Sequence, residues 1–211
     1  MIATVTMPRL LYIGGGAIAE APTALARLEA SRPLIVTDSF MASSGMLARL
    51  TDRLDAAGIA WQVFADTVPD PTTDVVEAGV ALMKHAPYDC LIALGGGSPI
   101  DTAKAMSVLA ANGGQMRDYK VPNEIPRQGL PLIAIPTTAG TGSEVTRFTV
   151  ITDSERDEKM LIMGLACCPS AANPATRDER GRFRPAIAPG PGAVRRPRQK
   201  HRRGRRTSRG P

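Results

Sequence analysis

Three consecutive glycines, Gly95 to Gly97, follow a short apolar run and precede a helical pattern, and this order constrains the fold more than any other stretch. The run from Tyr88 to Leu94 is almost continuously apolar, as a strand covered on both faces of a sheet requires. Glycines lack a Cβ atom, so the backbone can turn sharply there and lie close to a ligand. We expect Ser98 as N-cap of the next helix, Pro99 in its first position and Asp101 as its capping-box acid.

A helix that begins directly after such a turn presents free N–H groups and the positive end of its dipole. This arrangement suits a pyrophosphate group. The same residues also fit a plain strand–turn–helix connection, and the pattern is not GxGxxG. From the residues alone, phosphate binding at this turn therefore stays one of two interpretations.

A second loop of small and hydroxyl-bearing residues, Pro136 to Thr146, follows another apolar run, Leu130 to Ile135. The carboxyl ends of parallel strands meet at one edge of a sheet, where neighbouring loops form a crevice. If these two strands are parallel neighbours, the second loop lies beside the glycine turn. We therefore expect one crevice between the two loops.

The rest of the chain alternates between short apolar runs and helical patterns, which predicts an α/β fold with a parallel sheet flanked by helices. Further strands are expected at 10–13, 33–37 and 59–64, helices at 17–30, 45–58, about 72–83 and 99–111, a polar loop at 115–129, and a β-hairpin near 147–163.

Asp38 directly follows the predicted strand 33–37. An acidic residue at this position of an α/β domain can accept hydrogen bonds from a ribose hydroxyl. It can equally cap the helical segment that begins at Ser39. Both interpretations of Asp38 are open at this point.

The formal net charge of +6 is divided unevenly along the 211 residues. Residues 173–211 contain thirteen Lys and Arg against two acidic residues, so residues 1–172 carry a net charge of −5. The tail is rich in Arg, Pro and Gly and has few large apolar residues, which predicts disorder. Its charge would bind nucleic acid non-specifically, so a nucleic-acid-binding protein that acts through this tail is the alternative to an enzyme.

No apolar run approaches the roughly 18 residues that a membrane span needs, and the first residues lack the pattern of a signal peptide. The three cysteines, Cys90, Cys167 and Cys168, do not suggest a disulfide framework. We expect no membrane contact and a cytoplasmic location.

The sequences GGGSPIDTAK at 95–104 and PTTAGTGSEVT at 136–146 together resemble the iron-containing (group III) alcohol dehydrogenases. The resemblance covers roughly residues 8–172, and the second loop favours this branch over glycerol dehydrogenase and dehydroquinate synthase. It implies a Rossmann-like dinucleotide-binding domain, followed in intact members by an all-helical domain that holds iron or another divalent metal. Such enzymes transfer a hydride between a small alcohol or aldehyde and NAD, and a homo-oligomer is compatible with the resemblance.

The resemblance also implies which residues bind the dinucleotide. Asp38 would contact the adenosine ribose and favour NAD over NADP. The pyrophosphate would be held by Gly96, Gly97 and Ser98. The adenine and nicotinamide sides would be lined by Thr137, Thr138, Thr141 and Thr146. Val150 would border the nicotinamide, Lys159 would reach a ribose hydroxyl of the nicotinamide half, and Asp101 is expected to be structural.

The resemblance ends near Ala172. Intact members take one aspartate and three histidines from the helical domain as metal ligands, whereas this chain contains two histidines, His85 and His201. We therefore expect a dinucleotide-binding domain over residues 1–172, no metal or catalytic residues, and a missing metal domain that leaves apolar surface exposed. A shift of reading frame would account for the tail 173–211, and we expect the chain to bind NAD without turnover.

Overall fold

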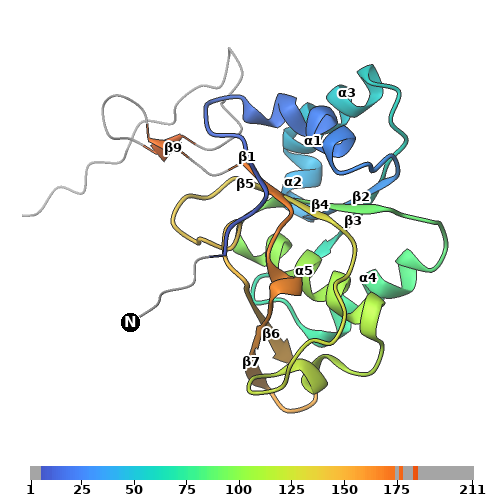
Figure 1. The fold of residues 1–211 in the computed structure, drawn as a ribbon, viewed down its shortest axis with the longest axis vertical. Helices are drawn as coiled ribbons and strands as arrows, with labels where there is room; N and C mark the ends of the chain where they lie inside the picture. Colours follow the sequence, from blue (N-terminus) through green and yellow to red (C-terminus); the bar gives the residue numbers. More distant parts are fainter. Residues whose placement is uncertain (1–5, 174–175, 178–182, 185–211) are drawn as a thin grey trace, which may run out of the picture.

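The computed structural model describes residues 6–173, 176–177 and 183–184. Six parallel strands form its main sheet in the order β1-β8-β5-β4-β2-β3 (Figure 1). The strands are β1 Leu10–Leu11, β2 Pro33–Asp38, β3 Gln62–Thr67, β4 Cys90–Gly95, β5 Leu132–Pro136 and β8 Ala171–Ala172. This arrangement confirms the predicted α/β fold with a Rossmann-like parallel sheet.

Strand β4 lies near the middle of the sheet, and all six of its residues are buried. Leu91 is aligned with Leu34 of β2 on one side and with Leu132 of β5 on the other. Its continuous apolar sequence follows from this position, because helices cover both faces of the sheet.

The side chains of each strand alternate between two hydrophobic clusters. Leu34 and Val36 pack with α4 Thr73–Met83 and α5 Gly97–Asn112 on one face. Ile35 packs on the opposite face, with the 3-10 helix η1 Ala17–Glu20, α1 Ala21–Arg27 and α3 Met46–Ala56. A short helix, α2 Ser39–Ser43, leads from β2 into α3.

Neighbouring strands β2 and β4 lead into helices on opposite faces of the sheet. The chain leaves β2 through α2 and α3 on one face, and it leaves β4 through α5 on the other (Figure 1). This is a topological switch point, where the carboxyl ends of open α/β sheets form a crevice for ligands. The glycine turn and Asp38 both lie at this point, because they end β4 and β2.

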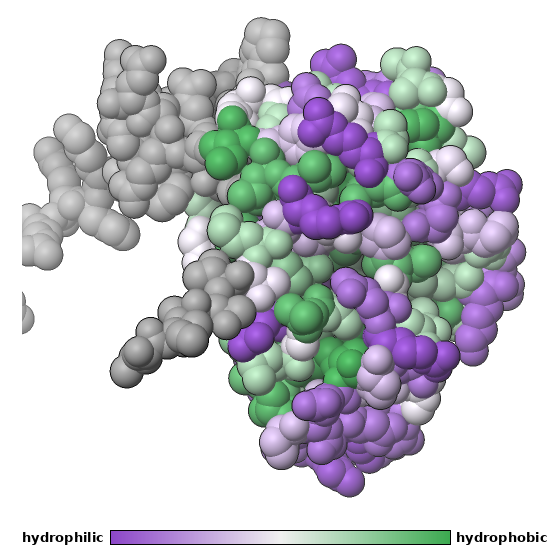
Figure 2. Space-filling model, viewed as in Figure 1, coloured by the Kyte–Doolittle hydropathy of each residue, from purple (hydrophilic) through white to green (hydrophobic). Residues whose placement is uncertain are grey.

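The predicted hairpin consists of β6 Phe148–Asp153 and β7 Glu158–Met163, which pair antiparallel. Its inner side chains, including Ile151 and Ile162, are fully buried and belong to the cluster around α5. The opposite face is open: Phe148, Val150, Leu161 and Met163 are each more than a third exposed. Figure 2 shows apolar surface on the side of the molecule where the hairpin lies.

One strand boundary, one helix and one loop differ from the sequence expectations. The strand expected from Ile59 begins at Gln62, because the N–H of Ile59 donates to Leu54 O at 2.9 Å and Gly58 takes φ 68°, which complete the end of α3. The region expected as one helix over 17–30 divides into η1 and α1. The expected polar loop contains the 3-10 helix η2 Met116–Tyr119, and its Met116 is fully buried.

Strand β8 was not expected from the sequence. It is followed by Asn173, whose backbone N–H donates to Ala134 O at 3.0 Å and whose side-chain Nδ2 donates to Ala17 O at 3.0 Å. A short 3-10 helix, η3 Leu165–Cys167, precedes it.

Within the tail, the structure describes β9 Thr176–Arg177 and β10 Phe183–Arg184, which pair antiparallel. The predictions of disorder, a shifted frame and nucleic-acid contacts in 173–211 otherwise lie outside the described residues. Among the described residues, no helix combines the length and apolar character needed to cross a membrane.

Candidate functional site

The glycine turn connects β4 to α5 in a geometry that requires glycine at its first position. Gly95 takes φ 148°, and a Cβ atom there would lie 2.6 Å from Pro99 Cγ. Side chains rarely adopt this φ, and the ring of Pro99 occupies the space that a methyl group would need. Glycine at this position therefore lets the chain turn from β4 into α5 without a clash with Pro99.

The helix begins earlier than the sequence suggested. Gly96 is the N-cap and has no side-chain cap hydrogen bond, so the prediction of Ser98 as N-cap with Asp101 closing a capping box is wrong. Gly95 and Gly96 complete the turn by themselves, which lets α5 start at Gly97. Pro99 then occupies the third helical position, where its missing N–H still costs no helical hydrogen bond.

The loop after β5 lies directly against this turn, as we expected from parallel neighbouring strands. Gly95 is aligned with Pro136, and the N–H of Thr137 donates to Gly95 O at 2.7 Å. A Cβ atom at Gly96 would lie 3.5 Å from Thr138 Oγ1, and one at Gly97 would lie 3.6 Å from Thr141 Cβ. The two loops thus lie side by side, with hydroxyl groups next to the free N–H groups at the start of α5.

Inside the second loop, weak contacts hold the chain. The N–H of Ser143 donates to Thr141 Oγ1 at 3.4 Å, and this hydroxyl lies 3.5 Å from Oε2 of the buried Glu144. The structure brings Thr138 next to Gly96 and Thr141 next to Gly97, whereas Thr146 lies beside a helical lysine described below. Their contacts with a dinucleotide remain predictions.

Asp38 caps a helix and lies beside the glycine turn. Its Oδ1 accepts the N–H of Met41 at 2.8 Å, so it is the N-cap of α2. Its Oδ2 is 3.5 Å from the Cβ position of Gly95. The two sequence interpretations of Asp38 are compatible, because one oxygen caps α2 while the other faces the turn.

The remaining expected residues belong to the hairpin and to the segment that leads into it. Val150 is 39% exposed, and its N–H donates to Asp101 Oδ2 at 3.3 Å. Lys159 lies beside the loop before α4, with Nζ 2.8 Å from Asp70 Oδ1 in an exposed ion pair. Thr146 Oγ1 is 3.4 Å from Lys104 Nζ.

Lys104 has a role that the sequence analysis did not identify. It is fully buried, and its Nζ donates to Thr146 O at 2.9 Å and to Phe148 O at 2.6 Å. Burial lowers the pKa of Lys104, while the charge of Asp101 opposes that change. Burial raises the pKa of Asp101, and Lys104 opposes it in turn. The i, i+3 spacing of these two residues was the available signal, because it places both on one face of α5.

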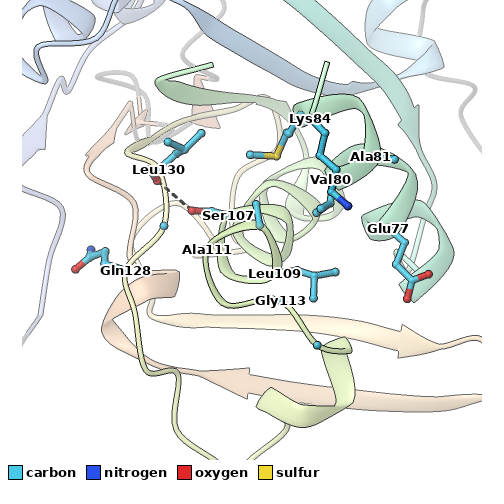
Figure 3. A pocket seen from close by; sticks show the side chains of 14 residues that line it. Glu77, Val80, Ala81, Lys84, Ser107, Leu109, Ala111, Gly113, Gln128 and Leu130 are labelled. Atoms are coloured by element: carbon cyan, nitrogen blue, oxygen red, sulfur yellow. Dashed lines mark hydrogen bonds between the residues drawn. The ribbon is translucent and has the colours of Figure 1, made fainter. Parts of the chain in front are cut away.

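A separate cavity of about 790 Å³ lies at the opposite end of α5 (Figure 3). Val80, Leu109 and Leu130 line it, and Ser107 Oγ donates to Leu130 O at 3.1 Å beside it. None of the expected site residues lines this cavity. The glycine turn and the second loop instead contact each other at the switch point, which is therefore the candidate site.

The described residues fit a dinucleotide better than a metal. The glycine turn, the start of a 16-residue helix and the adjoining hydroxyls are groups that can bind a phosphate-bearing ligand. In contrast, no three His, Cys, Asp or Glu side chains among the described residues are placed to hold a metal ion. We therefore assign no step of a reaction to a metal on these residues.

Comparisons with known proteins identify relatives over the described part of the chain. The family described as iron-containing alcohol dehydrogenase matches residues 8–173. The NAD-dependent methanol dehydrogenase of Bacillus methanolicus is 41% identical over 166 residues, which are 79% of this chain and 44% of that protein. The crystal structure of a 1,3-propanediol oxidoreductase is 29% identical with a TM-score of 0.79, over 82% of this chain and 46% of that one.

A further solved structure is that of sulfoacetaldehyde reductase from Bifidobacterium kashiwanohense in complex with NAD⁺. It is 32% identical with a TM-score of 0.76, over 82% of this chain and 46% of that one. The chain thus spans about half the length of the relatives that it matches.

Proposed function

Because the chain belongs to the iron-containing alcohol dehydrogenase family, we propose that residues 6–173 form the NAD-binding part of an NAD-dependent alcohol dehydrogenase. The observation that carries this proposal is the contact between the two loops at the switch point, where Thr137 N–H meets Gly95 O at 2.7 Å. Related proteins named as NAD-dependent or solved with NAD⁺ support the choice of cofactor.

We assign the ends of the dinucleotide by the elements that surround each part of the crevice. The pyrophosphate lies on Gly96, Gly97 and Ser98, because the free N–H groups at the start of α5 and the helix dipole attract negative charge there. Asp38 accepts hydrogen bonds from the adenosine ribose, since it ends the strand next to β4. Its negative charge disfavours the additional phosphate of NADP.

The nicotinamide end lies on the other side of the crevice, toward the second loop and the hairpin. The cofactor is lined there by Thr137, Thr138, Thr141 and Thr146, and Val150 borders the nicotinamide ring. Lys159 leaves its exposed ion pair with Asp70 and binds a hydroxyl of the nicotinamide ribose. When bound, NAD supplies the hydride acceptor for oxidation of an alcohol. The protein's contribution is to hold the ring in place and exclude water from one side.

We propose a small alcohol or aldehyde as the substrate class, in line with the names of the related proteins. Residues 6–173 bring no metal-ligand set together, so we expect the 211-residue chain to bind NAD without oxidising an alcohol. The test of turnover is NADH formation with NAD, added divalent metal and a small alcohol. NADH formation above a metal-free control would contradict this part of the proposal.

The test of cofactor binding is calorimetric titration of the 211-residue chain with NAD, together with its thermal unfolding. A ligand that binds only the folded state at about 100 times its Kd stabilises that state by about 2.7 kcal/mol. We therefore expect a higher Tm with saturating NAD and a smaller rise with NADP. Absence of any rise with NAD, and of any heat of binding, would refute the proposed function.

A further inference from the structure

Apart from the 3.4 Å contact between Lys104 Nζ and Thr146 Oγ1, helix α5 holds the start of the hairpin through four polar contacts from two residues. The backbone carbonyl of Asp101 accepts a hydrogen bond from Thr149 Oγ1 at 2.9 Å. Its side-chain Oδ2 accepts a hydrogen bond from the Val150 N–H at 3.3 Å. Lys104 donates to the carbonyls of Thr146 and Phe148 at 2.9 and 2.6 Å. All four contacts fall within residues 146–150, the segment that leads from the second loop into the hairpin.

Three of these contacts are partly buried, and the contact between Val150 N–H and Asp101 Oδ2 is exposed. Lys104 is fully buried and Thr149 is 1% exposed. A hydrogen bond that involves an ionised group is stronger than a neutral one, and the low dielectric of the interior strengthens it further.

Helix α5 contains both the first turn, where the pyrophosphate is proposed to bind, and the two residues that hold segment 146–150. Gly97 and Ser98 form its first turn, Asp101 lies one turn later, and Lys104 follows on the same face. A helix is a rigid element at this length, so the separation between its first turn and the strand attached to it is constant. Val150 is attached to that strand with its side chain on the open face.

We propose that Lys104 and Asp101 are positioning residues of the cofactor site: they fix segment 146–150 relative to the start of α5 and so place Val150 at the nicotinamide end. This inference rests on the proposed function. It goes beyond it, because neither residue itself needs to contact the dinucleotide. Their role is to set the distance between the part of the site that holds the pyrophosphate and the part that borders the nicotinamide.

The experiment compares two ligands that differ only at the end in question. ADP-ribose shares the adenosine, the pyrophosphate and a ribose with NAD but lacks the nicotinamide. Lys104→Met keeps a long apolar stem and removes the donors. We expect it to raise the Kd for NAD about tenfold, while the Kd for ADP-ribose stays within about twofold.

Two further variants separate positioning from general damage to the fold. Thr149→Val is nearly isosteric and removes only the hydroxyl that donates to Asp101, so we expect the Kd for NAD to rise about threefold and that for ADP-ribose to stay unchanged. This variant also tests the inference if Lys104→Met does not fold. Lys84→Met, at the exposed C-cap of α4, is the matched control and should change neither Kd.

The outcomes are distinguishable from those that test the proposed function. Equal losses for NAD and ADP-ribose would show a purely structural role for Lys104 and overturn the inference. Unchanged binding of both ligands by a folded variant would overturn it as well. If the unmodified chain binds ADP-ribose as tightly as NAD, the nicotinamide end is not recognised and the inference fails while dinucleotide binding stands. If it binds neither ligand, the proposed function itself fails.

Discussion

Replacing Gly95 by alanine tests the geometry on which the whole site depends. The alanine would have to adopt φ 148°, and its methyl group would lie 2.6 Å from Pro99 Cγ and 3.2 Å from Pro99 Cβ. A residue held in a sparsely populated backbone region costs about 1–3 kcal/mol, and an additional methylene in a packed site costs about 1–3 kcal/mol. Together they predict that Gly95→Ala lowers the free energy of unfolding by about 2–6 kcal/mol, a large part of the roughly 5–15 kcal/mol of a typical domain.

The assay is urea unfolding followed by circular dichroism, with two comparison variants. Gly58→Ala has a positive φ of 68° but open space around its Cβ position, so it should cost only about 1–2 kcal/mol of backbone strain. The double variant Gly95→Ala/Pro99→Ala removes the ring atom at 2.6 Å and should recover about 1–3 kcal/mol relative to additivity.

A loss at Gly95→Ala no larger than that at Gly58→Ala would refute the steric part of the reasoning. Additive effects in the double variant would refute the assignment of Pro99 as the clashing group. NAD binding by the folded fraction of Gly95→Ala should also be weaker, because the start of α5 must shift to accommodate the methyl group.

Three further predictions concern other parts of the chain. Burial raises the pKa values of the Cys90 and Cys167 thiols above the ordinary 9.0, to about 12 for Cys167. The stability that the two protonated thiols contribute is complete below pH 9. It is lost as the pH rises above 9, at up to about 1.4 kcal/mol per pH unit for each thiol. Urea unfolding between pH 8 and 10.5 should show this decline, and Cys90→Ala should have a shallower slope than the unmodified chain. Asp38→Asn keeps a capping side chain, so it should change stability by less than about 0.5 kcal/mol, while the preference for NAD over NADP in calorimetric titrations falls about tenfold; an unchanged preference would contradict the assignment of Asp38 to the ribose. Leu161→Lys, on the open face of the hairpin, should reduce the binding of a hydrophobic dye and shift stability by less than about 0.5 kcal/mol; undiminished dye binding would show that the exposed apolar surface lies elsewhere.

The main features of the site could be predicted because local sequence signals and the connection rules of parallel sheets agree. Gly95 to Gly97 after a buried apolar run specify a turn at the carboxyl end of a strand, and Pro136 to Thr146 specify a second loop of the same kind. The side-by-side position of the two loops then follows from the neighbouring parallel strands, and the structure confirms it.

The features that the sequence analysis missed depend on tertiary contacts. Lys104 resembles any helical lysine until the hairpin covers α5, and only then do two strand carbonyls become its acceptors. Ser98 has the sequence features of an N-cap, but the backbone of Gly95 and Gly96 completes the turn before it. Ala171 and Ala172 carry no strand signal of their own, because their pairing depends on the space between β5 and β1.

Strand β8 makes the edge of the sheet depend on residues from distant parts of the chain. β1 pairs with β8 in the main sheet, at Leu10↔Ala171 and Leu11↔Ala172, and β8 in turn pairs with β5. During synthesis on the ribosome, β2, β3, β4 and β5 can therefore assemble while the first strand still has no partner. Leu10 and Leu11 can join the sheet only after Ala172 has left the exit tunnel, so the first strand to be synthesised is among the last to be paired.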